Sequence, residues 1–365
     1  MPALRRTRAA LALLVIAAAV AGCSTSATSG GDATTGASVV PLSEITPLAD
    51  PKAYEGPSTA LLESASVTPV ATDPEQSLPV TVTSHDLDGD TAITVESTER
   101  VLGLSLAGDI AATIYGLGLG DSLVGRDVST TMPEAEDLPI VTTGGHSINS
   151  ESVLALRPTL IITDGTVGPT DVILQLRDAG IAVVFVKTEP SIDGTAELAR
   201  QVAAAMGVES TGELLADAMA EETAAKIAEI ADIAPADADD KLRIAFLYLR
   251  GSAGIYYLFG EGSGADVLVD ALGGIDVAKE IDWTGMKPMT DEALIAANPD
   301  LILVMTDGLE SAGGIDGLLA EKPAVGLTTA GQNRRFVDMA DGEILGFGPR
   351  FPAVLDALAR AVYAP

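Results

Sequence analysis

The sequence has a single cysteine, Cys23, and only two histidines, His85 and His146. One cysteine cannot form a disulfide within the chain, and these residues are too few for a zinc site of three histidines or four cysteines. Aromatic residues make up only 4% of the chain. Basic residues are also scarce, because 21 Lys and Arg stand against 52 Asp and Glu and give a net charge of −31. Such a chain is repelled by phosphate backbones, which argues against nucleic acid as a partner.

The N-terminus has the pattern of a secretory signal peptide over residues 1–22. Three arginines precede an apolar stretch, residues 9–22, that is shorter than the roughly 20 residues a membrane-spanning helix needs. The stretch ends in Val20-Ala21-Gly22-Cys23, which resembles the bacterial lipobox, in which the cysteine sulfur receives a lipid. We therefore expect a lipidated Cys23 to anchor an extracytoplasmic protein to the outer face of the cell membrane. The alternative is a buried structural cysteine.

The remaining chain is predicted to contain a tether followed by α/β structure. Residues 23–77 have the composition of a flexible linker and an extended arm. Alternating residues from 78 to 95 predict a β-hairpin. Short apolar runs that alternate with helical patterns then predict a mostly parallel sheet. These runs are 101–106, 139–141, 160–163, 182–186, 244–248, 301–305 and 335–339.

An internal repeat indicates two lobes of one design. Residues 151–162 match residues 292–303, with identical Glu, Ala, Pro, Leu and Ile at equivalent positions. In both copies a polar N-cap starts a short helix, and proline ends it before a buried strand. A chance similarity between two βα units is the alternative.

A capping box at Ser210 and Glu213 begins a long Ala/Glu-rich helix between the two copies. We therefore expect an N-terminal lobe at 78–208, a connecting helix at 209–235 and a C-terminal lobe at 236–365.

Two loops at strand ends carry the candidate ligand-binding residues. His146 follows a predicted strand and two glycines, and ligands of open α/β sheets bind at the carboxyl ends of strands. Tyr248 and Arg250 end the first strand of the second lobe and project to the same side. A neighbouring arginine favours the phenolate, which is an oxygen ligand for iron. One histidine and one tyrosine from opposite lobes can coordinate the two faces of a metallo-porphyrin, whereas a bare metal ion would want more ligands.

An enzymatic interpretation has weaker support. Gly145-His-Ser147 approaches a nucleophile elbow but lacks the final glycine. His146 adjoins the serine, so His85 in the predicted hairpin would have to act as the base. A surface hydrolase using Ser147 therefore stays as an alternative, and the chain has no P-loop sequence.

Residues 78–365 resemble the substrate-binding lipoproteins of haem-uptake ABC transporters. The motifs that carry the resemblance are Gly144-Gly-His-Ser147, Tyr248-Leu-Arg-Gly251 and the Glu…Pro spacing of both repeat copies. The resemblance implies a class III fold, in which two Rossmann-like α/β lobes are joined by one long helix. It also implies a monomeric, non-enzymatic receptor that binds haem and delivers it to an ABC transporter permease.

The resemblance also assigns roles to residues of this chain. His146 and Tyr248 would be the axial iron ligands, Arg250 would hold Tyr248, and Met305 would line the pocket. Glu151 and Glu292 would meet arginines of the permease. An alternative for both glutamates is a favourable interaction with the dipole of their own helix.

Three questions stay open at the level of sequence. A ferric siderophore or cobalamin could replace haem as the ligand on the same fold. Tyr256 or Tyr257 could coordinate the ligand or stack on it, although residues 255–258 also have the pattern of an ordinary strand, which is the interpretation we prefer. The haem propionates call for basic groups, for which Arg126, Lys287 and Arg350 are the candidates.

Overall fold

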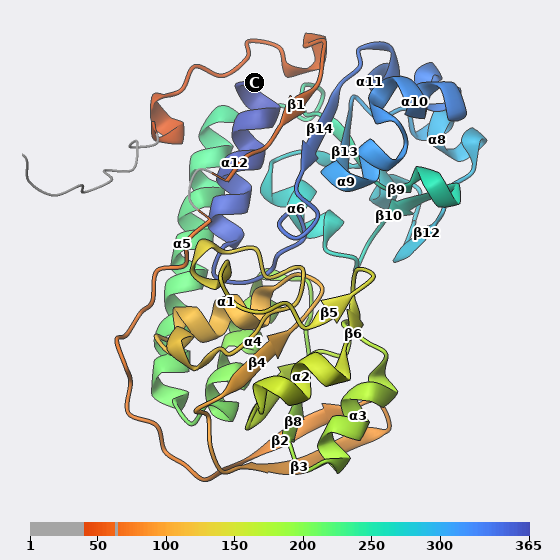
Figure 1. Cartoon of the computed structure of the whole chain (residues 1–365). Helices are drawn as coiled ribbons and strands as arrows, with labels where there is room; N and C mark the ends of the chain where they lie inside the picture. Colours follow the sequence, from red (N-terminus) through yellow and green to blue (C-terminus); the bar gives the residue numbers. More distant parts are fainter. Residues whose placement is uncertain (1–39, 63–64) are drawn as a thin grey trace, which may run out of the picture. The chain divides into compact units, whose positions relative to one another are not determined.

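The fold is α/β, as predicted, with two lobes connected by a long helix (Figure 1). The computed structural model describes residues 40–62 and 65–365. The predicted signal peptide at 1–22 and Cys23 lie outside the described residues. Within the described ranges, no helix combines the length and the hydrophobicity that crossing a bilayer requires.

The first lobe contains a three-stranded parallel sheet in the order β4-β7-β8, preceded by an antiparallel hairpin. The hairpin was predicted, whereas the strand predicted at 139–141 is wrong. Ile140 makes only an isolated bridge to Arg126, and a two-stranded ribbon starts at Thr142. The strands are β2 (Val80–Asp86), β3 (Gly89–Val95), β4 (Val101–Leu104), β5 (Thr142–Thr143), β6 (Ser147–Ile148), β7 (Leu160–Thr163) and β8 (Ala182–Phe185). The helices are α1 (Asp109–Gly116), α2 (Ser150–Leu156), α3 (Thr170–Asp178) and α4 (Ile192–Ala205).

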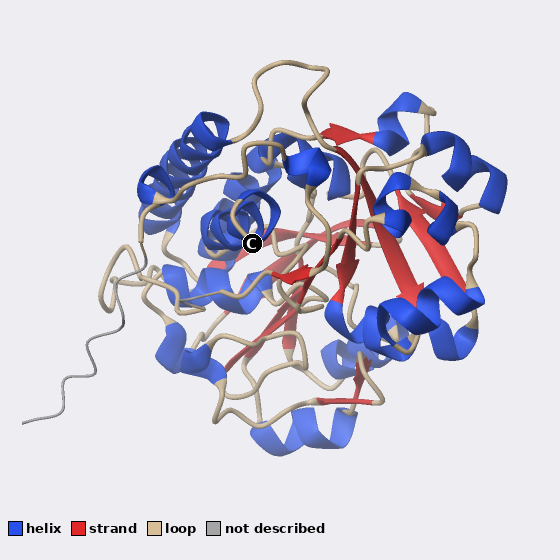
Figure 2. Ribbon diagram, turned by 90° about the horizontal axis from the view of Figure 1, so that it is seen from above, coloured by secondary structure: helices blue, strands red, loops and turns tan. Residues whose placement is uncertain are grey.

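The second lobe is built on a larger mixed sheet in the order β1-β14-β13-β9-β10-β12, flanked by helices (Figure 2). Its strands are β1 (Ser58–Thr59), β9 (Arg243–Arg250), β10 (Ile255–Phe259), β11 (Ile275–Asp276), β12 (Met286–Pro288), β13 (Leu301–Met305) and β14 (Phe336–Met339). Its helices are α6 (Ala265–Ala271), α7 (Val277–Glu280), α8 (Asp291–Ala297), α9 (Thr306–Ser311), α10 (Gly314–Glu321), α11 (Thr329–Gln332) and α12 (Phe351–Tyr363). Strand β10 runs antiparallel to both β9 and β12, so these three strands form a ribbon at one edge of an otherwise parallel sheet.

The connecting helix α5 spans Glu209–Ile233 and has 25 residues. At 1.5 Å per residue it is about 37 Å long. Its N-cap is Val208, which makes no side-chain capping bond. The predicted capping box is therefore wrong, because the helix begins one residue before Ser210. Apolar residues such as Leu215 and Met219 are buried on one side of the helix, against α4.

The repeat predicted from the sequence is present in the structure. Helices α2 and α8 each have seven residues and are capped by the side chains of Asn149 and Thr290. Each helix ends at a left-handed residue, Arg157 (φ 47°) or Asn298 (φ 41°), immediately before the proline. The proline leads into β7 in the first lobe and β13 in the second lobe.

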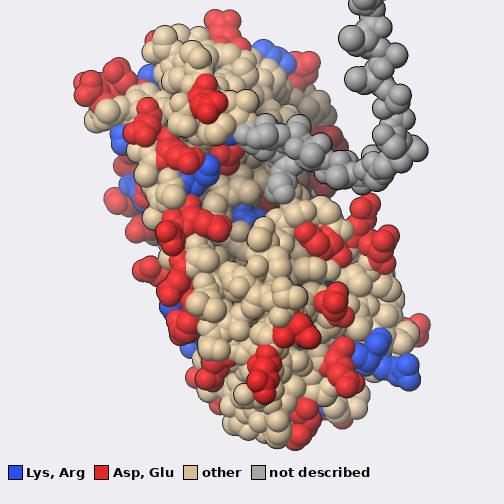
Figure 3. Space-filling model, turned by 90° about the vertical axis from the view of Figure 1, so that its left-hand side faces the viewer, with Lys and Arg blue, Asp and Glu red and all other residues tan. Residues whose placement is uncertain are grey.

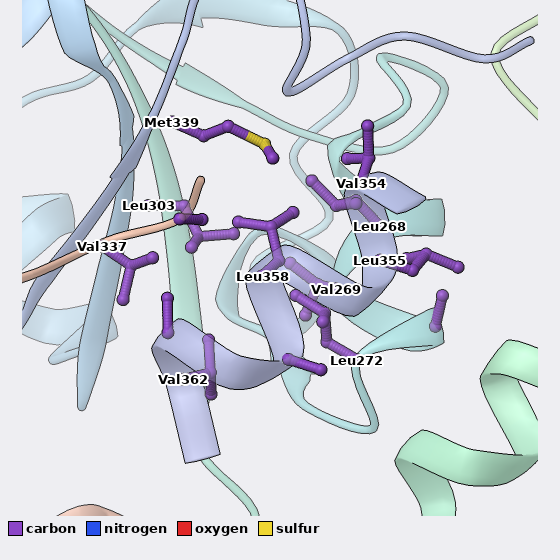
Figure 4. Close-up of a cluster of buried hydrophobic side chains, with 14 of the residues drawn as sticks. Leu268, Val269, Leu272, Leu303, Val337, Met339, Val354, Leu355, Leu358 and Val362 are labelled. Atoms are coloured by element: carbon purple, nitrogen blue, oxygen red, sulfur yellow. The ribbon is translucent and has the colours of Figure 1, made fainter. Parts of the chain in front are cut away.

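The core of the second lobe lies between its sheet and two helices. Figure 4 shows side chains of α12 and α6 meeting those of β13 and β14. The labelled cluster includes Leu303, Val337 and Leu358, all of which are 0% exposed. Burial of a leucine or valine side chain contributes about 1.5–3 kcal/mol, so this layer fixes the strands whose far ends carry the candidate site.

Part of the predicted arm belongs to the second lobe, which the sequence did not indicate. Residues 58–59 form β1 and pair in parallel with β14 at the edge of the sheet. Two short 3-10 helices precede it, η1 (Leu42–Glu44) and η2 (Pro51–Ala53), and Leu42 is completely buried. Farther along, Val70 N donates to Gly116 O of the first lobe.

The arm also encloses a buried cation, Arg335, which is 1% exposed. Its guanidinium donates to Ser58 Oγ and to the carbonyls of Ala361 and Val362, and it lies 4.5 Å from the centre of the Tyr54 ring. Burial lowers the pKa of Arg335 to about 10. The arm therefore helps to satisfy a charge that the lobe holds away from water.

We expect the Ser58→Ala variant to lower the free energy of unfolding by about 1.5–3 kcal/mol, because it removes a hydrogen bond to a charged group. Urea denaturation of wild type and variant measures the difference. Glu55→Ala is the control, since Glu55 is exposed in the same arm and its replacement should change the free energy by about 0.5 kcal/mol or less. Equal effects of the two changes would contradict the role given to Ser58.

Candidate ligand-binding site

A cavity of about 390 Å³ is lined by residues of both lobes. Apolar side chains form much of its wall. They include Leu106 of the first lobe and Tyr248, Phe259, Met286, Met305 and Phe347 of the second lobe. Leu106 and Met286 are large apolar side chains that remain 42% and 45% exposed. Exposed apolar residues gathered at a concave site are typical of ligand binding.

The wall contributed by the second lobe is set by strand register. Tyr248 of β9 lies directly opposite Tyr257 of β10, and Phe259 lies opposite Met286 of β12. Residues paired in this way share one face of the sheet. Met305 follows Val304, the partner of Leu247, so it lies beside Tyr248 in the next strand. The result is an apolar and aromatic face that spans several neighbouring strands.

Tyr248 is held by an arginine on its own strand. Arg250 Nε donates to Tyr248 Oη at 2.6 Å, which is a charge-assisted contact. The ring packs edge-on against Phe259, with centroids 6.0 Å apart and an interplanar angle of 85°. The phenol oxygen therefore has a fixed position with a guanidinium beside it.

His146 lies in the turn of the β5–β6 ribbon of the first lobe. Gly144 (φ 56°) and Gly145 (φ 92°) adopt backbone conformations that other residues rarely take, and they allow the turn. The ring is half-buried, and its Nδ1 is buried without a hydrogen-bond partner among the described residues. Burial, and then the positive charge of Arg250, hold the pKa of His146 below 6.5. Tyr248 lines the 390 Å³ cavity, whereas His146 is not among its lining residues.

Of the two other tyrosines considered as ligands, Tyr256 lies on the far face of the sheet and Tyr257 on the cavity face. Tyr256 lies on the opposite face from Tyr248, where its hydroxyl bonds Glu321 Oε2 at 2.5 Å and Lys322 lies 4.5 Å from its ring. Burial and then Glu321 raise the pKa of Tyr256 to about 12. These contacts direct Tyr256 away from the cavity, whereas Tyr257 shares the cleft face with Tyr248.

The cavity wall also carries four acidic residues, which were not predicted from the sequence. Asp109, Asp164, Glu189 and Asp341 line it, and burial raises the pKa of all three aspartates, that of Asp109 to about 7. Among the described residues, no Lys or Arg lines this cavity. Figure 3 shows the same imbalance on an outer face of the molecule, where acidic side chains predominate.

The three basic residues considered for propionates are engaged elsewhere. Arg126 donates to Thr130 O, Lys287 to Thr284 Oγ1, and Arg350 to Thr131 Oγ1 with Glu343 at 3.9 Å. None of them lines the 390 Å³ cavity. Arg250 is the basic group that bonds the candidate iron ligand Tyr248.

The residues considered for a hydrolase, for a bare metal ion and for permease docking do not join the candidate ligand-binding site. His85 bonds Asp90 in the hairpin, and neither histidine is hydrogen-bonded to Ser147, so the hydrolase constellation is not assembled. No cluster of three or more His, Cys, Asp or Glu suited to a bare metal ion occurs in residues 40–62 and 65–365. Glu151 and Glu292 are exposed on α2 and α8.

Comparison with known proteins identifies the class. Residues 104–341 match the family model described as periplasmic binding protein. The crystal structure of the heme binding protein HmuT is 39% identical, with a TM-score of 0.79 over 87% of this chain and 100% of HmuT. Three further HmuT structures carry alanine in place of a histidine, a tyrosine or an arginine, the last two being two residues apart in HmuT.

Two other proteins are similar to this chain. The periplasmic heme-binding protein RhuT from Roseiflexus sp. RS-1, in its apo form, is 37% identical, with a TM-score of 0.64 over 73% of this chain and 98% of RhuT. A cobalamin-binding protein of Halobacterium salinarum is 29% identical over 297 residues, which is 80% of this chain and 76% of that protein.

The chain belongs to the periplasmic binding protein family and has the class III fold. Members of this family are substrate-binding proteins of ABC importers rather than enzymes, and they work outside the cytoplasm.

Proposed function

We propose that the protein is a receptor that binds ferric haem between its lobes, with His146 and Tyr248 as axial ligands, and delivers it to an ABC transporter permease. The observation that carries the proposal is the phenol of Tyr248, which lines the cavity and is held by Arg250. On the other lobe, His146 lies in a loop with its Nδ1 buried and without a hydrogen-bond partner among the described residues.

The chemistry of this pair suits ferric haem. Haem iron takes four nitrogens from its own macrocycle and leaves two axial positions. A neutral imidazole is the form that binds metal, and the lowered pKa of His146 keeps it neutral at physiological pH. The phenol oxygen of Tyr248, held in position by Arg250, is an oxygen ligand of the kind that haem iron accepts. The apolar face around Tyr248 provides a surface for the macrocycle.

The comparisons support the same ligand. HmuT and RhuT are both named for heme binding. The HmuT residues replaced by alanine are of the same three types as His146, Tyr248 and Arg250, and the tyrosine and arginine have the same spacing. Cobalamin is the alternative ligand, favoured by the Halobacterium relative and by an acidic cavity wall that suits a ligand rich in amide donors.

Two further parts of the proposal concern the membrane. Cys23 would carry the lipid that tethers the receptor to the outer face of the cell membrane, after removal of residues 1–22. Glu151 and Glu292, one on each lobe, would contact basic residues of the permease. Both glutamates are exposed at the start of repeat helices, where they are accessible to a partner.

A titration tests the choice of ligand. Haemin added to the purified protein should produce a shifted Soret band that saturates, while cyanocobalamin at the same concentrations should neither change its own spectrum nor compete. Binding of cobalamin without any Soret change from haemin would replace haem by the alternative.

The pH dependence of haem binding should follow His146. Protonated imidazole cannot coordinate iron, so we expect His146 to add a loss of affinity on acidification below its lowered pKa, under pH 6.5. Soret titrations between pH 5 and pH 8, values chosen to bracket the ordinary histidine pKa of about 6.5, measure this. The His146→Ala variant should lack the part of the affinity loss at low pH that protonation of His146 causes. An equal loss of haemin affinity at low pH in wild type and variant would contradict His146 as an iron ligand.

A further inference from the structure

The two short repeat helices expose the same kind of surface on both lobes. The exposed positions share a spacing of i, i+3 and i+4, which places them on one face of a helix. They are Glu151, Leu154 and Ala155 on α2, and Glu292, Ile295 and Ala296 on α8. Leu154 is 48% exposed and Ile295 is 39% exposed. An exposed helix face is ordinarily polar, yet each of these carries a large apolar side chain and an alanine beside its glutamate. On α8 the exposed Asp291 adds a second carboxylate.

The rest of each helix holds this face in place. Val153 and Leu294, which precede the exposed apolar residues, are buried in their lobes. Each helix is capped by a side chain at its start and is followed by a buried proline, Pro158 or Pro299. The exposed triplets are therefore presented on supported backbone rather than on loops, and they require little ordering when a partner binds.

The charges of the triplets are available to a partner. Within residues 40–62 and 65–365, neither Glu151 nor Glu292 forms an ion pair or accepts a side-chain hydrogen bond. A surface complementary to one triplet would carry a basic side chain next to an apolar one. Because the triplet occurs once in each lobe, the matching partner offers that surface twice, as two copies of one subunit do.

We propose that Leu154 and Ile295 are the apolar contacts of two equivalent docking sites, at which each lobe meets one of two like subunits of the permease. This inference rests on the proposed delivery to a permease and extends it from the glutamates to the residues one helical turn away. Burial of an apolar side chain at the centre of a contact supplies more affinity than an exposed ion pair. The apolar pair therefore supplies much of the affinity, and the glutamates provide orientation.

Uptake and ligand binding can be measured separately to test this. In cells whose own gene is deleted, the full chain carrying Leu154→Asp or Ile295→Asp should slow haem uptake by roughly tenfold or more, the effect of losing about 1.4 kcal/mol of contact. Haemin affinity of the purified variants should equal that of wild type, since neither residue lines the cavity. Leu174→Asp on α3 and Leu214→Asp on α5 are matched controls, because these leucines are 37% and 59% exposed. The controls should leave uptake within about twofold, as surface changes away from an interface do.

Crosslinking gives a second, direct measurement. A photo-crosslinking amino acid at position 154 or 295 should form an adduct with the transporter's permease subunit, identified by mass spectrometry, whereas one at position 174 should not. Normal uptake by the Leu154→Asp/Ile295→Asp double variant, or equal loss in the controls, would overturn the proposal. If the wild type failed to bind haemin, the haem assignment would fall, while the crosslinks would still decide the docking sites.

Discussion

The Tyr248→Ala variant is expected to bind haemin more than about 100-fold more weakly than wild type, because loss even of a group that only supports a metal ligand costs about 10- to 100-fold. The change removes the phenol oxygen that Arg250 holds at 2.6 Å. It should also remove the spectral features of an iron–phenolate bond. Equilibrium Soret titration gives the affinity, and the visible spectrum of the ferric complex reports the ligand.

The neighbouring tyrosine provides a matched control. Tyr256 lies on the opposite face of the sheet and bonds Glu321, so Tyr256→Ala should leave the haemin spectrum unchanged and the affinity within about twofold, as expected for a change outside the site. A greater loss of affinity in Tyr256→Ala than in Tyr248→Ala would show that the ligand lies on the other side of the sheet.

The second large effect is expected at Asp109, in the acidic wall of the cavity. Burial, with Asp164 nearby, raises the pKa of Asp109 to about 7 from 3.8. The protonated carboxyl therefore stabilises the folded state at low pH, and that contribution is lost as the pH rises through about 7. We expect Asp109→Asn to raise the free energy of unfolding by about 2–4 kcal/mol at pH 8, at 1.36 kcal/mol per pKa unit, and by much less at pH 4.

Urea denaturation at the two pH values measures this difference. Asparagine keeps an acceptor oxygen for Ser105 Oγ, which bonds Asp109 Oδ1 in the wild type. Asp171→Asn is the control, because Asp171 is exposed in the first turn of α3 and its replacement should change stability by about 0.5 kcal/mol or less. If Asp109→Asn raised the free energy of unfolding more at pH 4 than at pH 8, this would contradict a buried carboxyl with a raised pKa.

The fold could be predicted because its signals are local. The proline after each repeat helix and the buried strands at 160–163 and 301–305 are readable in short windows of sequence. The i, i+2 spacing of Tyr248 and Arg250 on one strand determines that they share a side, and the structure shows them in contact. The ligand roles of His146 and Tyr248 themselves stay predictions.

Other features could not be predicted because they depend on residues far apart in the chain. Strand β1 at 58–59 pairs with β14 at 336–339, and a two-residue strand has no detectable period of its own. The acidic wall unites Asp109, Asp164 and Asp341 from three separate segments. The capping box at Ser210 failed because the helix already begins at Glu209, so Ser210 lies inside it.

The most direct measurement is a crystal structure of the wild-type protein grown with haemin, with the iron located by its anomalous scattering. For the proposed haem complex we expect one iron atom between the lobes, bonded to a ring nitrogen of His146 and to Tyr248 Oη, with Arg250 still donating to the phenol oxygen. An iron atom bound to other side chains, or a macrocycle held outside the cavity between the lobes, would contradict it.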